Sequence, residues 1–258
     1  MTPQDAERAA ALIAGARETA RAVTLEGPLA PKSIDDAYAV QALLAKKAGG
    51  VAGWKIAGIV PEQRDKLGID RPIAGAVLQG YRHPSPATFR ASSFVLVIIE
   101  GEFDFILGRD LPARPKPYSV DEVAAAVAEL RPAIELVDSR VGRTSPTFVK
   151  LADCFSNGAL ILGPAHKEWR GLDLLSHVVT LRIDGKVVAT GKGSTIPGGP
   201  LNALVTLANN PPAWSGGLKA GQAVTTGAAA LTPQLEPGAH EVVAEFGALG
   251  EVRISLTA

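Results

Sequence analysis

Two glutamates at the end of an apolar segment have a spacing that could bind a metal ion. Glu100 and Glu102 follow the run Phe94–Ile99, and in a strand they would share one face, about 7 Å apart along the backbone. Two such carboxylates would repel each other, and their burial would cost hydration energy. A cation between them would compensate for both effects. Oxygen ligands favour Mg²⁺, Ca²⁺ or Mn²⁺ over zinc. The alternative is a strand that emerges into solvent with Glu100, Glu102 and Asp104 on its polar face.

A third carboxylate lies in a second segment with the pattern of a strand. Glu135 shares its strand face with Ala133 and Val137, and an acid buried there needs a partner. One partner is Arg140, in a structural ion pair. The other is a metal ion shared with Glu100 and Glu102.

Lys55 is a candidate for proton transfer. Its neighbours on the same strand face, Gly53 and Ala57, are small and leave room beside the ammonium group. A buried lysine near a bound oxo acid could move a proton or bind a carboxylate, because burial readily lowers the pKa of lysine. The alternative is a lysine at a sheet edge whose ammonium group reaches water.

Two polar loops have compositions that suit ligand binding. Residues 153–158 contain Ser156 and precede an apolar strand, and residues 193–200 contain Ser194 and Pro197 and precede a helix. Backbone amides at a glycine-rich helix entry can bind a carboxylate, although such clusters are usually ordinary turns. The four histidines show no spacing typical of metal ligands.

Composition limits the classes of function. The 258 residues include 26 basic and 26 acidic side chains, so the formal net charge is zero and does not favour nucleic acid as a partner. The longest strongly apolar run, Phe94–Ile99, is too short to span a membrane. The single cysteine, Cys154, excludes an internal disulfide, and residues 4–22 have the pattern of an amphipathic helix, not a secretion signal. We therefore expect a soluble, cytoplasmic protein.

The elements that position these residues are of two kinds. Caps and apolar periodicity predict four helices, over residues 4–22, 33–49, 119–132 and 201–209. Period-two alternation and the turn Asp184-Gly185 predict two hairpins, over residues 178–189 and 240–256. The pattern indicates an α+β fold, with a helical N-terminal part (1–75) and a catalytic domain (76–258) dominated by antiparallel sheet.

Eight short motifs occur in order along nearly the whole chain: Gly53–Ile56, Leu67–Pro72, Glu100–Glu102, Leu107–Pro112, Pro132–Arg140, Asp153–Gly158, Pro200–Ala203 and Leu218–Gly221. Together they resemble the 2-oxopent-4-enoate hydratase and 4-oxalocrotonate decarboxylase family, within the fumarylacetoacetate hydrolase-like superfamily. No single motif is decisive, but their number and order are highly specific.

This resemblance implies roles for the residues above. The family's metal ligands correspond to Glu100, Glu102 and Glu135, and its active-site lysine corresponds to Lys55. Its substrate site corresponds to Ser156 and the loop that carries Ser194 and Pro197. The resemblance also implies a mixed, rolled β-sheet domain with a helical N-terminal part, and bound Mg²⁺ or Mn²⁺. A homo-oligomer and a small 2-oxo acid substrate are expected, and a complex with a pathway partner enzyme stays open.

One substitution bears on the reaction. Hydratases of this family carry an acidic residue directly after the proline that corresponds to Pro72, whereas this chain has Ile73, as the decarboxylases do. Ile73 would then belong to the substrate site. Leu107–Pro112 and Pro200–Ala203 are more similar to the hydratases. The resemblance predicts hydration of a 2-hydroxypenta-2,4-dienoate-type acid to a 4-hydroxy-2-oxo acid in aromatic-compound catabolism. The alternatives are a 4-oxalocrotonate-type decarboxylase and a catalytically silent subunit that binds an oxo acid.

Overall fold

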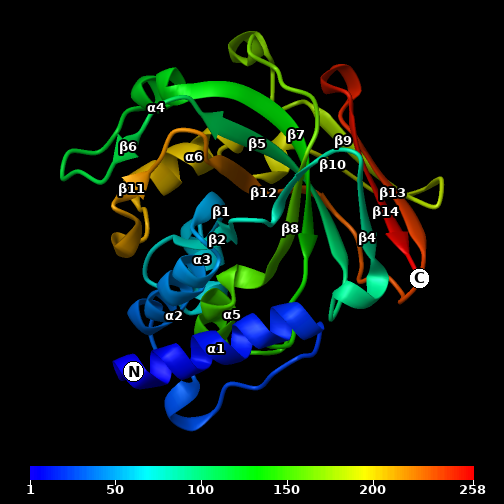
Figure 1. Ribbon diagram of the computed structural model, residues 1–258. Coiled ribbons are helices and arrows are strands. Elements are labelled where there is room, and N and C mark those ends of the chain that lie inside the picture. The colour runs from blue at the N-terminus through cyan, green and yellow to red at the C-terminus, as the bar shows by residue number, and fades with distance from the viewer.

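The computed structural model describes residues 1–258, which form two curled β-sheets and six α-helices (Figure 1). The helices are α1 (Pro3–Thr19), α2 (Ile34–Lys47), α3 (Pro61–Leu67), α4 (Val120–Ala126), α5 (Thr147–Ala152) and α6 (Pro200–Asn209). The seven-stranded sheet has the order β2 (Ile73–Leu78), β1 (Val51–Ala57), β12 (Ala223–Leu231), β5 (Ile98–Leu107), β7 (Val127–Val137), β8 (Asn157–Leu162) and β3 (Arg82–Pro84). The five-stranded sheet has the order β10 (Lys186–Lys192), β9 (Val178–Ile183), β13 (His240–Glu245), β14 (Glu251–Thr257) and β4 (Ala87–Arg90). Two short strands, β6 (Leu111–Pro112) and β11 (Gly217–Leu218), pair with each other.

Both large sheets are mixed, as predicted. Strands β1 and β12, β3 and β8, and β4 and β14 pair in parallel. All other neighbouring strands of the two sheets are antiparallel. The long strands β5 and β7 lie at the centre of the seven-stranded sheet and curl with it (Figure 1). The predicted α+β class with a rolled, mixed sheet is confirmed.

The N-terminal helices form as their caps predict. The Thr2 hydroxyl accepts a hydrogen bond from the Asp5 amide at the start of α1, and Ser33 accepts one from the Asp36 amide at the start of α2. Helix α2 is tied to the sheet through the Tyr38 hydroxyl, which accepts a hydrogen bond from the β2 backbone at 2.9 Å. Strand β1 and the start of β2 also belong to residues 1–75, so the proposed boundary falls inside β2. The two-part division stays a prediction.

The helix expected over residues 119–132 is much shorter than predicted. The Ser119–Glu122 capping box forms, but α4 ends at Ala126 and β7 begins at Val127. Residues 127–137 pair with β5 along its whole length, which buries Val127 and Leu130 and satisfies the backbone in the sheet. The local sequence favours a helix here, and pairing with a distant strand outweighs that preference.

The remaining element predictions are confirmed. Strands β9 and β10 form the first hairpin, and both turn residues, Asp184 (φ 52°) and Gly185 (φ 78°), have the positive φ that a type I′ turn needs. Strands β13 and β14 form the second hairpin. Helix α6 lies where residues 201–209 predicted it. Cys154 is free and buried, and no helix is long and apolar enough to cross a membrane.

Candidate metal centre and substrate pocket

Three carboxylates meet where β5 and β7 lie side by side. Glu100 on β5 is directly opposite Glu135 on β7, and Glu102 follows on the same face of β5. One carboxylate oxygen from each residue can be chosen so that all three lie within 4.8 Å of one another. Glu102 and Glu135 are buried and Glu100 is half-buried. The alternative of a solvent-exposed polar strand face is therefore wrong, and even Asp104 is fully buried.

The electrostatics of this cluster favour a bound cation. Burial raises the pKa of Glu102 well above its ordinary value, and the nearby charges of Glu135 and Glu100 raise it further. Burial also raises the pKa of Glu100, and repulsion from Glu135 adds to this while Lys55 opposes it. The Oε2 atom of Glu135 is buried without a hydrogen-bond partner, so it is free to contact a cation. This set of oxygen donors fits Mg²⁺ or Mn²⁺.

Lys55 forms a buried ion pair with this cluster. Its Nζ atom lies 2.7 Å from Glu135 Oε1, and 5.7 Å from the centre of the Phe155 ring. Burial acts to lower the pKa of Lys55, but attraction to Glu135, Glu100 and Glu102 outweighs it, so the pKa lies above its ordinary value. The expectation that burial lowers the pKa of this lysine is therefore wrong, because sequence spacing did not show the acids around it. The alternative of an ammonium group that reaches water is also wrong.

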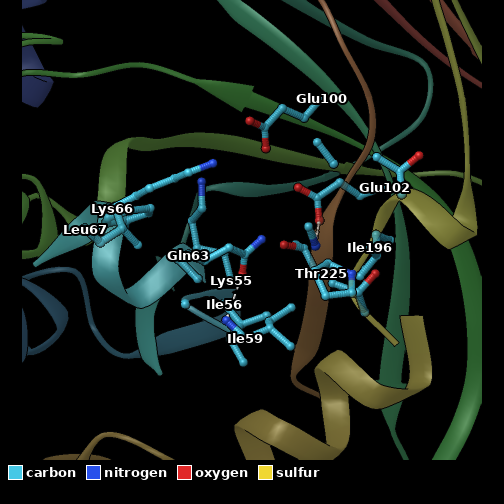
Figure 2. Close-up of a pocket in the computed structure, with 18 residues that line it drawn as sticks. Lys55, Ile56, Ile59, Gln63, Lys66, Leu67, Glu100, Glu102, Ile196 and Thr225 are labelled. Atoms are coloured by element: carbon cyan, nitrogen blue, oxygen red, sulfur yellow. Dashed lines mark hydrogen bonds between the residues drawn. The ribbon is translucent and has the colours of Figure 1, made fainter. Parts of the chain in front are cut away.

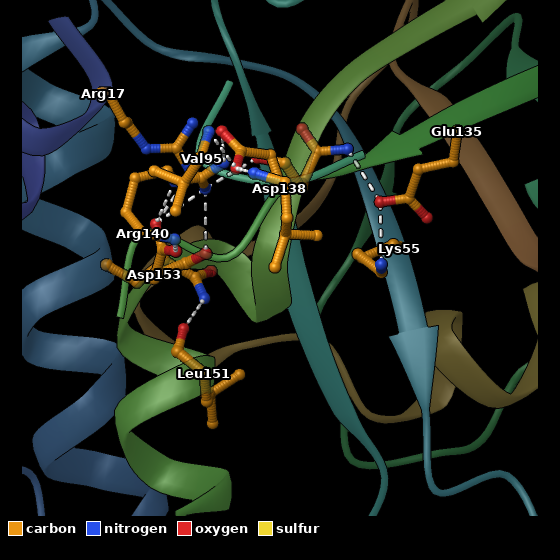
Figure 3. A network of polar contacts seen from close by, with 11 residues as sticks. Arg17, Lys55, Val95, Glu135, Asp138, Arg140, Leu151 and Asp153 are labelled. Carbon is orange, nitrogen blue, oxygen red and sulfur yellow. Dashed lines mark hydrogen bonds and ion pairs between the residues drawn. The ribbon is translucent and has the colours of Figure 1, made fainter. Parts of the chain in front are cut away.

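Arg140 is not the partner of Glu135. Its guanidinium group pairs with Asp153 at 2.7 Å and with Asp138 at 3.4 Å, and Arg17 from α1 reaches Asp153 at 3.3 Å (Figure 3). All four side chains of this network are almost fully buried. The ion pair that was considered between Arg140 and Glu135 therefore does not form, because Arg140 pairs with Asp153. Glu135 instead contacts Lys55 and belongs to the carboxylate cluster.

The same network holds a strained turn beside the site. Cys154, Phe155 and Ser156 all have positive φ, between 51° and 64°, and such a backbone costs about 1–2 kcal/mol per residue. Arg140 donates a hydrogen bond to the Asn157 carbonyl at 2.8 Å. The turn directs Phe155 into the pocket and lets the Asn157 side chain donate to Glu135 Oε1 at 2.9 Å. Asn157 therefore orients the Glu135 carboxylate, a role that sequence reasoning missed.

Glycines fix how closely the backbone approaches this site. Gly75 pairs with Lys55 across β2 and β1, and a Cβ atom there would lie 2.2 Å from the Cys154 carbonyl oxygen and 2.9 Å from Lys55 Cγ. Gly227 (φ 100°) lies in a register shift of β12, where its amide donates to Glu102 Oε2 at 2.7 Å. A glycine inside a strand pattern is the sequence signal for such a bulge.

A cavity of about 350 Å³ opens beside the carboxylates (Figure 2). This volume lies at the small end of ligand sites in proteins. Most of its wall comes from β1, α3, the loop after β10, and β12. The polar and charged lining side chains are Lys55, Gln63, Lys66, Glu100, Glu102, Thr195, Thr225 and Thr226, and the apolar ones include Ile56, Ile59, Leu67, Phe155, Ile196 and Pro197. Such a pocket suits a small acid with an apolar carbon chain.

The structure distributes the predicted substrate-site residues unevenly. Pro197 lines the pocket. Ser156 is buried next to Phe155 and Ser194 is exposed next to Thr195, and in both pairs only the neighbour lines the pocket. Ile73 is buried in the main hydrophobic core, outside the pocket wall. Roles in substrate binding for Ser156, Ser194 and Ile73 stay predictions.

The fold is shared with solved structures that contain a bound metal ion. The 4-oxalocrotonate decarboxylase from Pseudomonas putida G7, complexed with magnesium and adipate, has a TM-score of 0.88 over 98% of both chains at 22% identity. The fumarylpyruvate hydrolase from Pseudomonas aeruginosa, in complex with Mn²⁺ and pyruvate, has a TM-score of 0.55 at 12% identity, over 79% of this chain and 88% of that one. The chain therefore has the fumarylacetoacetate hydrolase-like fold, with a buried acidic cluster in its largest sheet.

Proteins that are similar in sequence show to which family the chain belongs. A 2-keto-4-pentenoate hydratase from Paraburkholderia xenovorans (strain LB400) is 32% identical over 244 residues, which cover 92% of this chain and 90% of the relative. A 4-oxalocrotonate decarboxylase from a Pseudomonas species is 31% identical over 160 residues, which cover 62% of this chain and 60% of that protein. No family model matches the chain. The chain belongs to the 2-keto-4-pentenoate hydratase family, which confirms the resemblance found in its motifs.

Proposed function

We propose that this chain is a lyase, dependent on Mg²⁺ or Mn²⁺, that hydrates a 2-hydroxypenta-2,4-dienoate-type acid to a 4-hydroxy-2-oxo acid in aromatic-compound catabolism. The observation that carries the proposal is the convergence of Glu100, Glu102 and Glu135 with Lys55 beside one small pocket. Membership of the hydratase family supports the choice of reaction. Magnesium and Mn²⁺ in the structural neighbours support the choice of metal.

The side chains would divide the work as follows. A divalent cation held by the three glutamates would supply Lewis acidity toward the 2-oxygen and carboxylate of the substrate. Lys55 Nζ would hold the proton that reaches C5 of the dienoate when the enol becomes a 2-oxo-3-enoate. The apolar wall formed by Ile56, Phe155 and Ile196 would hold the carbon chain and exclude bulk water. One water molecule then adds its oxygen at C4 and a proton at C3.

Decarboxylation is the alternative that the sequence favours at one position. No acidic side chain follows Pro72, and Ile73 is buried in β2. If hydration needs an acid there, the chain would instead decarboxylate 4-oxalocrotonate. A cation held by the three glutamates would then supply the Lewis acidity that stabilises the negative charge left when CO₂ departs. A catalytically silent subunit that binds an oxo acid is a further alternative, which the retained Lys55 and glutamates disfavour.

The assembly is also a proposal. From the composition we expect a cytoplasmic protein, and by family resemblance a homo-oligomer; a complex with a pathway partner enzyme stays open. Analytical sedimentation of the purified chain measures the oligomeric state, and a single monomeric species would contradict the homo-oligomer.

Calorimetric titration of EDTA-stripped protein with Mg²⁺ and Mn²⁺, with and without oxalate as a planar enolate mimic, tests the site. We expect metal binding that oxalate tightens and that Glu102→Gln abolishes. Glu135→Gln should fold but lose metal-dependent activity, whereas Glu251→Gln, at an exposed site on β14, should behave like the unaltered protein. Folded protein that binds neither metal would refute the lyase assignment.

The same preparation separates the reactions. Loss of dienoate absorbance without CO₂ release indicates hydration, and CO₂ release from 4-oxalocrotonate indicates decarboxylation. Metal binding without turnover of either substrate supports the silent subunit. Lys55→Ala should lower turnover far more than it weakens metal binding, because the lysine serves the proton and not the cation. An equal effect on both would contradict that role.

A further inference from the structure

Gln63 on α3 presents an unpaired amide group to the pocket. Its side-chain oxygen accepts a hydrogen bond from the Ile59 amide at 2.9 Å. Because a backbone N–H group can donate only to the oxygen of that side chain, the bond fixes the orientation of the Gln63 amide. The Nε2 atom therefore points away from Ile59 and toward Thr225, across the pocket (Figure 2). No protein group accepts a hydrogen bond from this atom, so its N–H groups are available to a ligand.

Thr225 adds a second polar group without a partner. It lines the pocket and is buried, and its Oγ1 atom has no hydrogen-bond partner in the protein. A buried hydroxyl that lacks a partner destabilises a fold, so such a group indicates a bound water or ligand atom. The next residue differs, because Thr226 Oγ1 donates to the Phe103 carbonyl oxygen at 2.8 Å. Gln63 and Thr225 thus form a neutral polar pair whose hydrogen bonds are not made within the protein.

Strand pairing places Thr225 beside Lys55. The two residues are partners in the parallel pairing of β1 with β12, so their side chains lie on the same face of the sheet. In the proposed reaction Lys55 supplies the proton at C5 of the dienoate, and C4 is the adjacent carbon atom. An oxygen atom that approaches C4 from the β12 side would meet the Thr225 hydroxyl and the Gln63 amide.

We propose that Gln63 and Thr225 bind the water molecule that adds to C4, and that they bind the 4-hydroxyl group once it has formed. This inference rests on the proposed function, because it assumes that a dienoate is hydrated at this site. The Gln63 amide donates a hydrogen bond to the water oxygen, and the water donates one to Thr225 Oγ1. One lone pair of the water oxygen is then left for C4.

The step balances without a further reactant. The water oxygen forms a bond to C4, and the π electrons of the C3–C4 bond move toward C3 and the 2-oxygen. The water releases one proton, and C3 takes up one proton. Gln63 and Thr225 orient the water through hydrogen bonds, and neither of them changes its charge.

Separating the two steps of the reaction tests this inference. Proton NMR during turnover by metal-loaded protein resolves the dienoate, the 2-oxo-3-enoate and the 4-hydroxy-2-oxo acid. We expect Gln63→Leu and Thr225→Val each to slow water addition about tenfold, the size of one hydrogen bond to the reacting water. Formation of the 2-oxo-3-enoate needs no water at C4, so it should stay within about twofold and the 2-oxo-3-enoate should accumulate.

Binding gives a measurement that does not depend on turnover. 4-Hydroxy-2-oxopentanoate and 2-oxopentanoate differ only in the 4-hydroxyl group. By calorimetry we expect metal-loaded protein to bind the hydroxy acid about fivefold more tightly, and Gln63→Leu and Thr225→Val each to reduce this preference. The affinity for 2-oxopentanoate should stay within about twofold in both variants.

Arg64→Met is the control for the position of α3. Arg64 lies outside the pocket wall and donates to the carbonyl oxygens of Gly58 and Ile59 at 3.2 and 3.1 Å. Its replacement loosens the helix but keeps the Gln63 amide, so the ratio of the two step rates and the ligand preference should be kept.

The outcomes separate this inference from the proposed function. If Gln63→Leu and Thr225→Val slow both steps equally, or leave water addition unchanged, these residues do not bind the reacting water. An equal loss of affinity for both ligands would also contradict the inference. If the unaltered metal-loaded protein forms no 4-hydroxy-2-oxo acid, the proposed function itself fails, and this inference fails with it.

Discussion

Replacing Lys55 by methionine should destabilise the metal-free protein, and the structure sets the size of the loss. The ammonium group is the only cationic side chain within 4 Å of the Glu135 carboxylate, at 2.7 Å, and both side chains are buried. Breaking a buried ion pair by removing one partner costs about 3–5 kcal/mol.

The loss in Lys55→Met should therefore depend on bound metal. We expect a loss of about 3–5 kcal/mol in EDTA at pH 7. A bound divalent cation should reduce the loss at pH 7, because it supplies the missing positive charge.

Urea unfolding followed by circular dichroism measures these free energies, in EDTA and in excess Mg²⁺. Lys186→Met, an exposed lysine, serves as the matched control and should change stability by less than about 0.5 kcal/mol. A loss below about 1 kcal/mol in EDTA, or one that is no smaller in excess Mg²⁺, would refute the reasoning. It would mean that water or another group neutralises Glu135.

Two further predictions concern the same site. Gly75→Ala should lower both the melting temperature and turnover, because the new Cβ atom would lie 2.2 Å from a backbone carbonyl oxygen that cannot move aside cheaply. Gly185→Ala, in open space on the β9–β10 turn, is the control for the backbone strain that any glycine replacement causes. Equal turnover in the two variants would contradict the prediction for Gly75. Metal affinity should rise with pH above about 4.5, by up to tenfold per unit for each proton released, because Glu100 and Glu102 have raised pKa values and must lose protons to bind a cation. Calorimetry at several pH values in buffers of different ionisation enthalpy measures both the affinity and the protons released, and a flat profile would show that the glutamates are already ionised.

The sequence alone determined the features that depend on local periodicity and on motif order. Alternation along a strand placed Glu100 and Glu102 on one face, and the pair Asp184-Gly185, which is common in type I′ turns, defined the first hairpin turn. The ordered motifs indicated the family, and they predicted the three glutamates as metal ligands and Lys55 as the active-site lysine. The fold brings these four side chains together. Each of these inferences uses residues a few positions apart, or a comparison with known sequences.

Only the tertiary structure decided the contacts between distant segments. Pairing of β5 with β7 set Glu135 opposite Glu100 and turned residues 127–132 from the expected helix into strand. Packing of the buried segments placed Arg140 in an ion pair with Asp153 and not with Glu135. The same packing kept the pKa of Lys55 raised, and α3 carried Lys66 into the pocket. Strand register, burial and the partner of a charge depend on residues far apart in the chain, so spacing within one segment cannot determine them.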